Sequence, residues 1–557
     1  MRREFLKRIF GVTLITALAM GTVACGSTDG TNTAEQSTVN VSEESSQTIS
    51  TQESENSEEA SADITYPLQD AEKLTLWATT PGIASIYSDY TESPYHMGLQ
   101  ENTGVEVEWT FPALGANWKE SYNLLLTEDT LPDIIAYSIN VSAAQLLAQD
   151  GVIYDLTDYI PKYAPDYWEY LNAEGNEAVL KAAKSEDGRI YGVRTSVETE
   201  LNPTYIGPVI RQDWLDELNL EVPVTLVDWE NVLVAFKEKY NAKLGFVKGK
   251  WNMGIASGVN AQAGLSAEYY VDADGKIQFA NAQPEWKESL EVLHKWYEMG
   301  LIDQDSFTMN DDALRTKVLN NEIGVSITAM SQLTNWCLDA EKQNPGAVWV
   351  GMEYPRVAAG VPTSRIQGGN RSGSFVAVIT KECTEEKMIT ALKWLNYGYT
   401  EDGFMYQNFG TEGTNYTLDS DGKPHWTDLM KNDPDGLEQA IIKYTGTYSS
   451  ALGGIQSTDM VLIKNHETAA EAVYKWAQNT DNSKYLLPSL AMTDEESLVI
   501  TDVATPIKAY VGEMALKYVL GEASLDDFDA FVAELDKMGL QKCLDAYQAA
   551  YDRYLAR

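Results

Sequence analysis

The sequence predicts an α/β fold with a largely parallel sheet. Short apolar runs at residues 73–79, 105–110 and 131–135 are typical of strands. Helical segments separate these runs, and one of those segments covers residues 118–126. Strands that alternate with helices usually pair in parallel, and ligands then bind beyond the carboxyl ends of the strands.

Local sequence features explain each of these predicted strands and helices. Residues 73–79 read K-L-T-L-W-A-T, and residues 105–110 alternate apolar with polar side chains, as half-buried strands do. The first helix runs to Glu101 and ends at Asn102-Thr103-Gly104, because Gly is favoured just past a helix terminus. The run L-P-D-I-I at residues 131–135 is short, apolar and bounded by turn residues.

Two helices are predicted at the C-terminal end. Ser524 and Asp527 resemble a capping box, and Gly539 separates the first helix from a second that begins near Leu540. We interpret both helices as core packing without a ligand. Their apolar positions are Leu525, Phe528, Phe531, Val532, Leu535 and Met538, followed by Leu544, Tyr547, Tyr551 and Tyr554.

Composition excludes several classes of function. Among 557 residues, 83 are acidic and 41 are basic, so the surface disfavours nucleic acids and other phosphate polyanions. Hydrophobic residues make up 44% of the chain and aromatic residues 10%, which is enough for a folded core. The length allows about two to four domains, or fewer larger ones.

The first 25 residues read as an export signal. Four basic residues precede an apolar stretch, and a run of small residues then leads to Cys25. The apolar part, residues 9–24, is shorter than the roughly 20 residues of a spanning helix, although an N-terminal membrane helix is the alternative. T-V-A-C resembles the lipobox of bacterial lipoproteins, with Thr22 in place of the usual Leu, and Cys25 would be the lipidated residue. R-R-E-F-L-K also resembles a twin-arginine motif, but we favour ordinary Sec export.

Residues 26–66 are predicted to be a disordered acidic tether. The part from Gly26 to Thr65 has nine acidic residues and no Lys, Arg or aromatic residue. Such a segment buries too little apolar area to order itself. A lipidated Cys25 and this tether would hold an exported body at the outer face of the cell membrane.

The remaining cysteines are Cys337, Cys383 and Cys543. Their odd number and wide spacing indicate neither a disulfide framework nor a CxxC metal site. We interpret them as mostly buried small hydrophobic residues, and a bridge between two of them stays open.

The usual signatures of catalysis are missing. The sequence has no G-x-S-x-G, P-loop, G-x-G-x-x-G or H-E-x-x-H motif, and its four histidines lie far apart. The many carboxylates show no local sequence pattern that would indicate the acid/base pair of a glycosidase. D-A-D-G at Asp272 and D-S-D-G at Asp419 are better explained as hairpin turns than as calcium loops. The sequence therefore predicts no catalytic residue, no cofactor and no metal.

Several strings in order resemble one family, the extracellular solute-binding lipoproteins of carbohydrate ABC transporters. The likeness is to family 1, in its large Gram-positive branch, and to maltodextrin-binding proteins. The strings are K-L-T-L-W (73–77), E-N-T-G-V-E-V (101–107), L-P-D-I-I-A-Y (131–137), D-L-T-D-Y-I (155–160), D-G-R-I-Y-G-V (187–193), I-R-Q-D-W-L (210–215) with V-P-V-T-L (222–226), E-I-G-V-S-I (322–327), A-L-K-W-L-N-Y-G-Y (391–399) and N-F-G-T-E-G-T-N-Y-T-L (408–418).

The resemblance implies a two-lobed type II periplasmic-binding-protein fold with hinge strands between the lobes. The first lobe would comprise residues 67–203 and 369–455, and the second would comprise residues 204–368 and 456–557. The protein would be a monomer that captures a saccharide, in particular an oligosaccharide, between its lobes. It would deliver the sugar to ABC permease subunits served by a separate ATPase. Many members carry a calcium loop where residues 241–250 read N-A-K-L-G-F-V-K-G-K, so we expect no structural calcium.

Candidate ligand residues combine aromatic rings with polar groups, as a sugar's apolar faces and hydroxyl rim require. Position after predicted strands nominates Trp77, Thr79, Thr80, Tyr137, Ser138 and Asn140. A basic Gly-containing loop nominates Trp251 and Asn252. The resemblance nominates Ser331, Gln332, Trp336, Asn370 and Arg371.

Each nomination has a structural alternative. Trp77 and Trp336 are equally compatible with the core, and Arg371 could simply bridge the lobes. We expect Arg211 and Trp214 to be structural, and the sequence assigns no role to Glu412 and Tyr416. Two other functions stay open: a surface-anchored glycoside hydrolase, and a peptide-binding or adhesive lipoprotein.

Overall fold

A computed structural model describes residues 64–79, 83, 86–87, 90–199, 204–247, 269–356, 358–360, 372–447, 453–478 and 486–556. The predicted signal peptide, Cys25 and almost all of the predicted tether lie outside these residues. Thr80, Trp251, Asn252, Asn370 and Arg371 lie outside them too. Residues Ile64–Arg557 form one compact unit.

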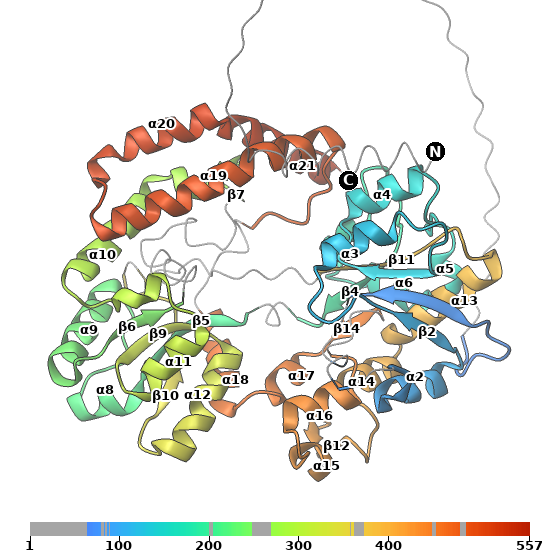
Figure 1. The fold of residues 1–557 in the computed structure, drawn as a ribbon, viewed down its shortest axis with the longest axis horizontal. Helices are drawn as coiled ribbons and strands as arrows, with labels where there is room; N and C mark the ends of the chain where they lie inside the picture. Colours follow the sequence, from blue (N-terminus) through green and yellow to red (C-terminus); the bar gives the residue numbers. More distant parts are fainter. Residues whose placement is uncertain are drawn as a thin grey trace, which may run out of the picture. The chain divides into compact units, whose positions relative to one another are not determined.

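The first sheet of this unit has six strands in the order β14-β4-β11-β3-β1-β2 (Figure 1). β1 pairs in parallel with β2 and β3, and β14 pairs in parallel with β4. β11 is antiparallel to both of its neighbours. The α/β prediction with a largely parallel sheet is confirmed, with β11 as the exception. The strands are β1 (Leu74–Ala78), β2 (Val107–Thr110), β3 (Ile134–Tyr137), β4 (Val193–Val197), β11 (Ser372–Ile379) and β14 (Gly454–Gln456).

The second sheet has the order β10-β5-β9-β6. β6 is parallel to β9, and β5 is antiparallel to both β9 and β10. Because its strands come from a different part of the chain, the two sheets define two lobes, each with its own apolar core. The strands are β5 (Ile206–Arg211), β6 (Lys243–Phe246), β9 (Ile323–Ala329) and β10 (Trp349–Gly351).

Two small hairpins complete the strands. They join β7 (Tyr269–Val271) to β8 (Ile277–Phe279), and β12 (Tyr416–Leu418) to β13 (Pro424–Trp426). Their turns are the D-A-D-G and D-S-D-G runs, in which Gly275 and Gly422 have φ of +76° and +77°. The interpretation of both runs as hairpin turns is confirmed.

Helices surround both sheets. Those in residues 94–183 and 385–444 are α2 (Pro94–Thr103), α3 (Trp118–Leu125), α4 (Val141–Gln149), α5 (Ile160–Tyr163), α6 (Pro165–Asn172), α7 (Glu177–Ala183), α13 (Glu385–Asn396), α14 (Glu401–Phe409), α15 (Asp428–Lys431) and α16 (Leu437–Tyr444). The others are α8 (Gln212–Leu218), α9 (Leu226–Tyr240), α10 (Pro284–Glu298), α11 (Asp311–Leu319), α12 (Met330–Gln343), α17 (Thr458–Ile463), α18 (Glu467–Ala477), α19 (Asp494–Leu520), α20 (Phe528–Met538) and α21 (Leu540–Ala556). Within the described ranges, none of the helices is long and apolar enough to cross a membrane.

Local sequence accounts for most of these boundaries. Gly104 caps α2 with φ of +73°, and Gly539 lies between α20 and α21 with φ of +100°, both as predicted. Tyr66 falls inside the predicted tether, yet its hydroxyl donates to the Lys393 carbonyl at 2.5 Å. The body therefore includes Tyr66. The three cysteines Cys337, Cys383 and Cys543 are buried and unbridged, so reading them as buried small residues is confirmed.

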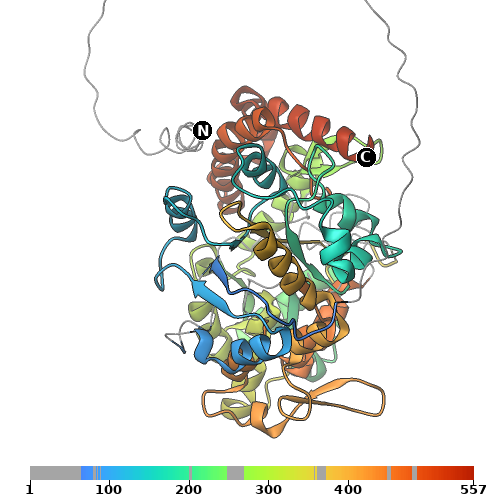
Figure 2. The ribbon, with the colours of Figure 1, turned by 90° about the vertical axis from the view of Figure 1, so that its right-hand side faces the viewer.

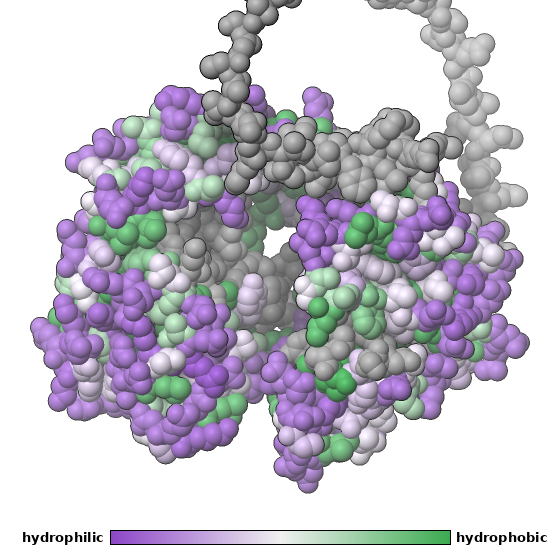
Figure 3. Space-filling view, in the orientation of Figure 1, coloured by the Kyte–Doolittle hydropathy of each residue, from purple (hydrophilic) through white to green (hydrophobic). Residues whose placement is uncertain are grey.

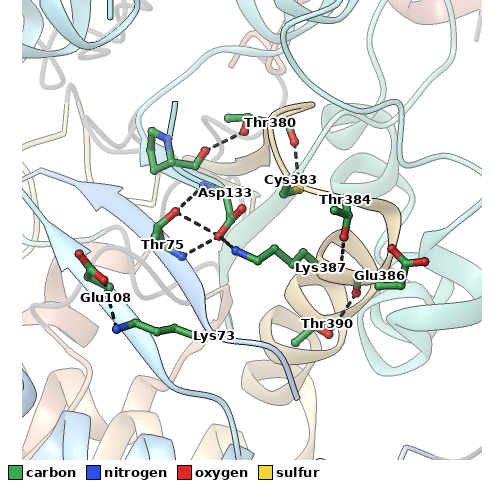
Figure 4. Close-up of polar contacts among 11 residues, drawn as sticks. Lys73, Thr75, Glu108, Asp133, Thr380, Cys383, Thr384, Glu386, Lys387 and Thr390 are labelled. Carbon is green, nitrogen blue, oxygen red and sulfur yellow. Dashed lines mark hydrogen bonds and ion pairs between the residues drawn. The ribbon is translucent and has the colours of Figure 1, made fainter. Parts of the chain in front are cut away.

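Asp133 sets the alignment of β1 with β3 (Figure 4). Its carboxylate accepts hydrogen bonds from the Thr75 backbone N–H at 2.8 Å and the Thr75 hydroxyl at 3.1 Å. The Lys387 ammonium on α13 lies 2.9 Å from the same oxygen, and Thr380 N–H donates to the Asp133 carbonyl at 2.9 Å. Because Asp133 is only 5% exposed, these bonds replace the water it has lost.

The C-terminal helices connect the two lobes away from the sheets. α19 packs on α10 of the second lobe, while its N-terminal end and α21 reach helices of the first (Figures 1 and 2). The Arg553 guanidinium binds Glu186 of the first lobe at 2.6 Å and both carboxylate oxygens of Glu496 at 2.7 and 2.6 Å. The Met492 N–H also donates to Ser142 on α4 at 2.9 Å.

We expect Arg553→Met to lower the free energy of unfolding by about 2 kcal/mol, because two largely buried carboxylates lose a charged donor. Burial by itself raises the pKa of Glu496, but hydrogen bonds from Arg553 and Thr493 outweigh burial and hold that pKa below its ordinary value. The bridge is therefore complete above the ordinary carboxyl pKa and is lost as pH falls through the folded pKa.

Urea denaturation of both proteins from neutral to acid pH measures this difference. Lys537→Met is the matched control, since Lys537 pairs with Glu534 on an exposed helix face and should leave stability nearly unchanged. A difference between wild type and Arg553→Met that is absent at neutral pH, or that grows in acid, contradicts the assignment.

Candidate functional site

An aromatic cluster lies where β1 and β3 end. Trp77 pairs with Ile135 in the sheet, and Tyr137 lies two residues beyond Ile135. Since side chains alternate along a strand, these three residues share one face of the sheet. The opposite face carries Leu74, Leu76 and Ala78, which belong to the buried core.

Tyr122 of α3 completes the cluster. Its ring stacks on Tyr137 with centroids 4.5 Å apart and an interplanar angle of 14°. The centroid of the Trp77 ring lies 6.2 Å from that of Tyr137 and 6.3 Å from that of Tyr122. Burial raises the pKa of the Tyr122 hydroxyl well above its ordinary value, so the group stays a neutral donor and acceptor. Trp77 is 6% exposed, whereas Tyr137 is only partly buried.

The neighbouring nominated residues differ in their surroundings. Thr79 is buried, and Ser138 is exposed. Asn140 is exposed and caps α4, with its side-chain oxygen accepting from Ala143 N–H at 2.8 Å. The side-chain oxygen of Asn140 is therefore used by the helix cap, and the side-chain NH₂ group is the part that could contact a ligand. The structure thus brings Trp77, Tyr137 and Ser138 to one edge of the first sheet.

A cleft of about 880 Å³ brings together Ser331, Gln332 and residues from distant parts of the chain. The first half of α12 and Tyr205 line one side, and the start of α16 with Glu438 lines another. The turn between α17 and α18, with Lys464, completes it. The surface in Figure 3 is hollowed between the two lobes. Ala329 precedes α12 without a side-chain cap, and helix starts of this kind present N–H donors to oxygen atoms.

Charged groups of both signs line this cleft. Burial lowers the pKa of the Lys464 ammonium, and the nearby Glu438 carboxylate opposes that shift. His466 Nε2 lies 3.2 Å from a Glu341 oxygen. The cleft therefore offers amide, hydroxyl, ammonium and carboxylate groups together, a mixture that suits a ligand with many hydroxyl groups.

Trp336 lies in the core of the second lobe. It is 1% exposed and contacts Trp349, with ring centroids 5.3 Å apart. Ser331 and Gln332 on the preceding turn of α12 line the cleft, whereas Trp336 packs behind it. As expected, Arg211 and Trp214 are structural, since the guanidinium binds Asp213 and lies 4.1 Å from the Trp214 ring centre.

The recurring string at Glu412 and Tyr416 also has a packing role. Tyr416 is 4% exposed and lies in a small core with Phe409 and Trp426. Glu412 forms an isolated β-bridge with Tyr416. This arrangement secures the β12–β13 hairpin on α14.

Sequence reasoning missed Tyr122, Lys464 and Tyr205. Tyr122 was part of a correctly predicted helix, but only the packing of α3 on the sheet reveals that it meets Tyr137. Lys464 and Tyr205 lie in connections between elements, where no periodic pattern marks them. In the described part of the chain, no group of three or more His, Cys, Asp or Glu side chains is arranged to hold a metal ion.

Comparison with known proteins shows what this chain is similar to. The profile of the family described as bacterial extracellular solute-binding protein matches residues 98–428. The fructooligosaccharide ABC transporter substrate-binding protein FusA of Streptococcus pneumoniae serotype 4 (strain ATCC BAA-334 / TIGR4) is 25% identical over 88% of this chain and 92% of its own. Lipoprotein LipO of Bacillus subtilis (strain 168) is 24% identical over 80% of this chain and 86% of its own. An HMO-binding, ABC-transporter-associated protein from Bifidobacterium longum infantis ATCC 15697 shares the fold, with a TM-score of 0.68, 22% identity, and coverage of 87% of this chain and 99% of that one.

Stacking of Tyr122 on Tyr137 predicts a measurable coupling. We expect Tyr122→Leu and Tyr137→Leu to interact by about 1 kcal/mol in a double-mutant cycle of unfolding free energies. Tyr474→Leu, which replaces a 49% exposed tyrosine on α18, is the control and should combine additively with Tyr137→Leu. Additivity of the Tyr122 and Tyr137 variants would contradict the stacked arrangement.

Proposed function

Because this chain belongs to the bacterial extracellular solute-binding protein family, we propose that it is the saccharide-capturing subunit of an ABC importer. The observation that carries the proposal is the Trp77–Tyr122–Tyr137 cluster at the carboxyl edge of the first sheet. Tyr122 and Tyr137 are only partly buried, and their rings offer a stacking surface for the apolar faces of a sugar, with the buried Trp77 packed against them.

The cleft lined by α12 of the second lobe and α16 of the first supplies polar groups. Ser331 and Gln332 reach the cleft from α12, and Lys464 and Glu438 reach it from other segments. A related protein is named for fructooligosaccharides, which supports a saccharide ligand here as well. Thr80, Trp251, Asn252, Asn370 and Arg371 stay predicted contacts of the same ligand.

Capture would occur without chemistry on the sugar. A glycosidase needs a carboxylic acid whose pKa is raised, placed beside a second carboxylate. Each described carboxyl group whose pKa departs clearly from its ordinary value has it lowered, as at Asp187, Asp228 and Glu496.

Delivery of the sugar would depend on the two lobes closing toward one another. An open form admits the saccharide, closure removes water from the cleft, and the closed form docks on the permease subunits. A separate ATPase would drive transport. Since apparent affinity falls with the fraction of binding-competent protein, closure must cost little free energy.

Isothermal titration calorimetry against fructooligosaccharides, maltodextrins, milk oligosaccharides and oligogalacturonides tests the proposal. We expect saturable binding to one of these classes, with the bound glycan recovered intact by chromatography. Tyr137→Ala should weaken that binding at least tenfold, which corresponds to about 1.4 kcal/mol. Absence of binding to every class, or appearance of shortened glycans, would contradict the proposal.

We also propose that lipid on Cys25 anchors the protein to the outer face of the cell membrane. The small-residue run before Cys25 and the acidic segment after it support this, and a relative is named a lipoprotein. Cys25→Ala should remove incorporation of labelled palmitate and release the protein from the membrane fraction. Cys543→Ala is the control, because Cys543 is buried in the body. Retention of Cys25→Ala in the membrane with undiminished label would contradict the anchor.

A further inference from the structure

α3 begins with an exposed tryptophan whose backbone is firmly held. Asn117 caps the helix, with its side-chain oxygen accepting from Lys119 N–H at 3.0 Å and from Glu120 N–H at 3.2 Å. Trp118, the next residue, is 52% exposed, and it is the one exposed tryptophan among the described residues. A large side chain left in water at a rigid position forfeits much of the free energy that burial would provide.

Trp118 shares a helix face with the aromatic cluster. Residues three or four apart on a helix are neighbours on its surface, so Trp118, Tyr122 and Leu125 form one stripe. The stripe is graded, because Leu125 is buried, Tyr122 is partly buried against Tyr137, and Trp118 is exposed. One helical turn of about 5.4 Å separates successive members, a spacing that suits consecutive sugar rings along a chain.

Polar groups lie around the exposed ring. Asn117, Lys119 and Glu120 are all exposed and flank Trp118 in sequence. Together they offer amide, ammonium and carboxylate groups at the edge of an apolar surface. A sugar ring needs this combination, since it stacks by one face and forms hydrogen bonds through its hydroxyl rim.

We propose that Trp118 stacks on a sugar unit beyond the one held at Trp77 and Tyr137, so that the site selects oligosaccharides over monosaccharides and disaccharides. The inference rests on the proposed function and adds to it a residue that determines the preferred length of the ligand. Continuity with the aromatic cluster favours a sugar over a protein partner on this surface, because Trp118 extends a stripe that leads to the candidate site.

Calorimetry on the purified full-length protein tests the inference with a series of increasing length. The probe is sucrose, kestose and nystose, or galacturonides of one to four units if wild type binds that class. We expect Trp118→Ala to weaken binding of the longest member about tenfold while leaving the shortest unchanged. Trp118→Tyr should restore most of the loss, because the ring face is kept.

Two variants separate the possible failures. Tyr474→Ala removes a similarly exposed ring from α18 and should leave every affinity unchanged, whereas Tyr137→Ala should weaken short and long ligands alike. Equal affinities of Trp118→Ala and wild type across the series overturn the inference. Unchanged affinity with reduced uptake by cells overturns it as well and assigns Trp118 to the permease contact. Wild type that binds none of the series contradicts the proposed function itself.

Discussion

The alignment of β1 with β3 is the constraint on which the candidate site depends. Asp133 fixes it by bonding to Thr75 on the neighbouring strand and to Lys387 on α13. A slip of one residue would turn the side chains of a strand to the opposite face of the sheet. Tyr137 would then leave Trp77 and enter the core, so a buried carboxylate at one edge of the sheet determines the aromatic surface at the other.

In the proposed complex, the two lobes divide the work of recognition. The first would contribute aromatic rings from β1, α3 and β3, and the second would contribute polar groups from the start of α12. Neither set alone matches a ligand that has both apolar faces and a hydroxyl rim. The Arg553 bridge links the lobes outside the sheets. A movement of one lobe relative to the other therefore either preserves the bond between Arg553 and Glu186 or breaks it.

Local sequence predicted the helices and strands that carry the candidate site better than it predicted the contacts between them. The α/β class, the start of α3 at Trp118 and the position of Tyr137 at the end of β3 could be predicted, because strand alternation and position after a strand are local signals. β3 begins at Ile134, three residues later than predicted, because Leu131, Pro132 and Asp133 lead into the strand. α19 was missed, although Thr493 and Glu496 form a capping box that marks its start. The approach of Tyr122 to Tyr137 depends on tertiary packing, which no local pattern encodes.

The central claim is that an unaltered saccharide is held between the two lobes. A crystal structure of the protein with a bound oligosaccharide tests this most directly. The account predicts an intact sugar chain with one ring against Trp77 and Tyr137 and hydroxyl groups bonded to residues of both lobes. A sugar bound to a single lobe away from these rings, or a cleaved product in the crystal, would contradict it.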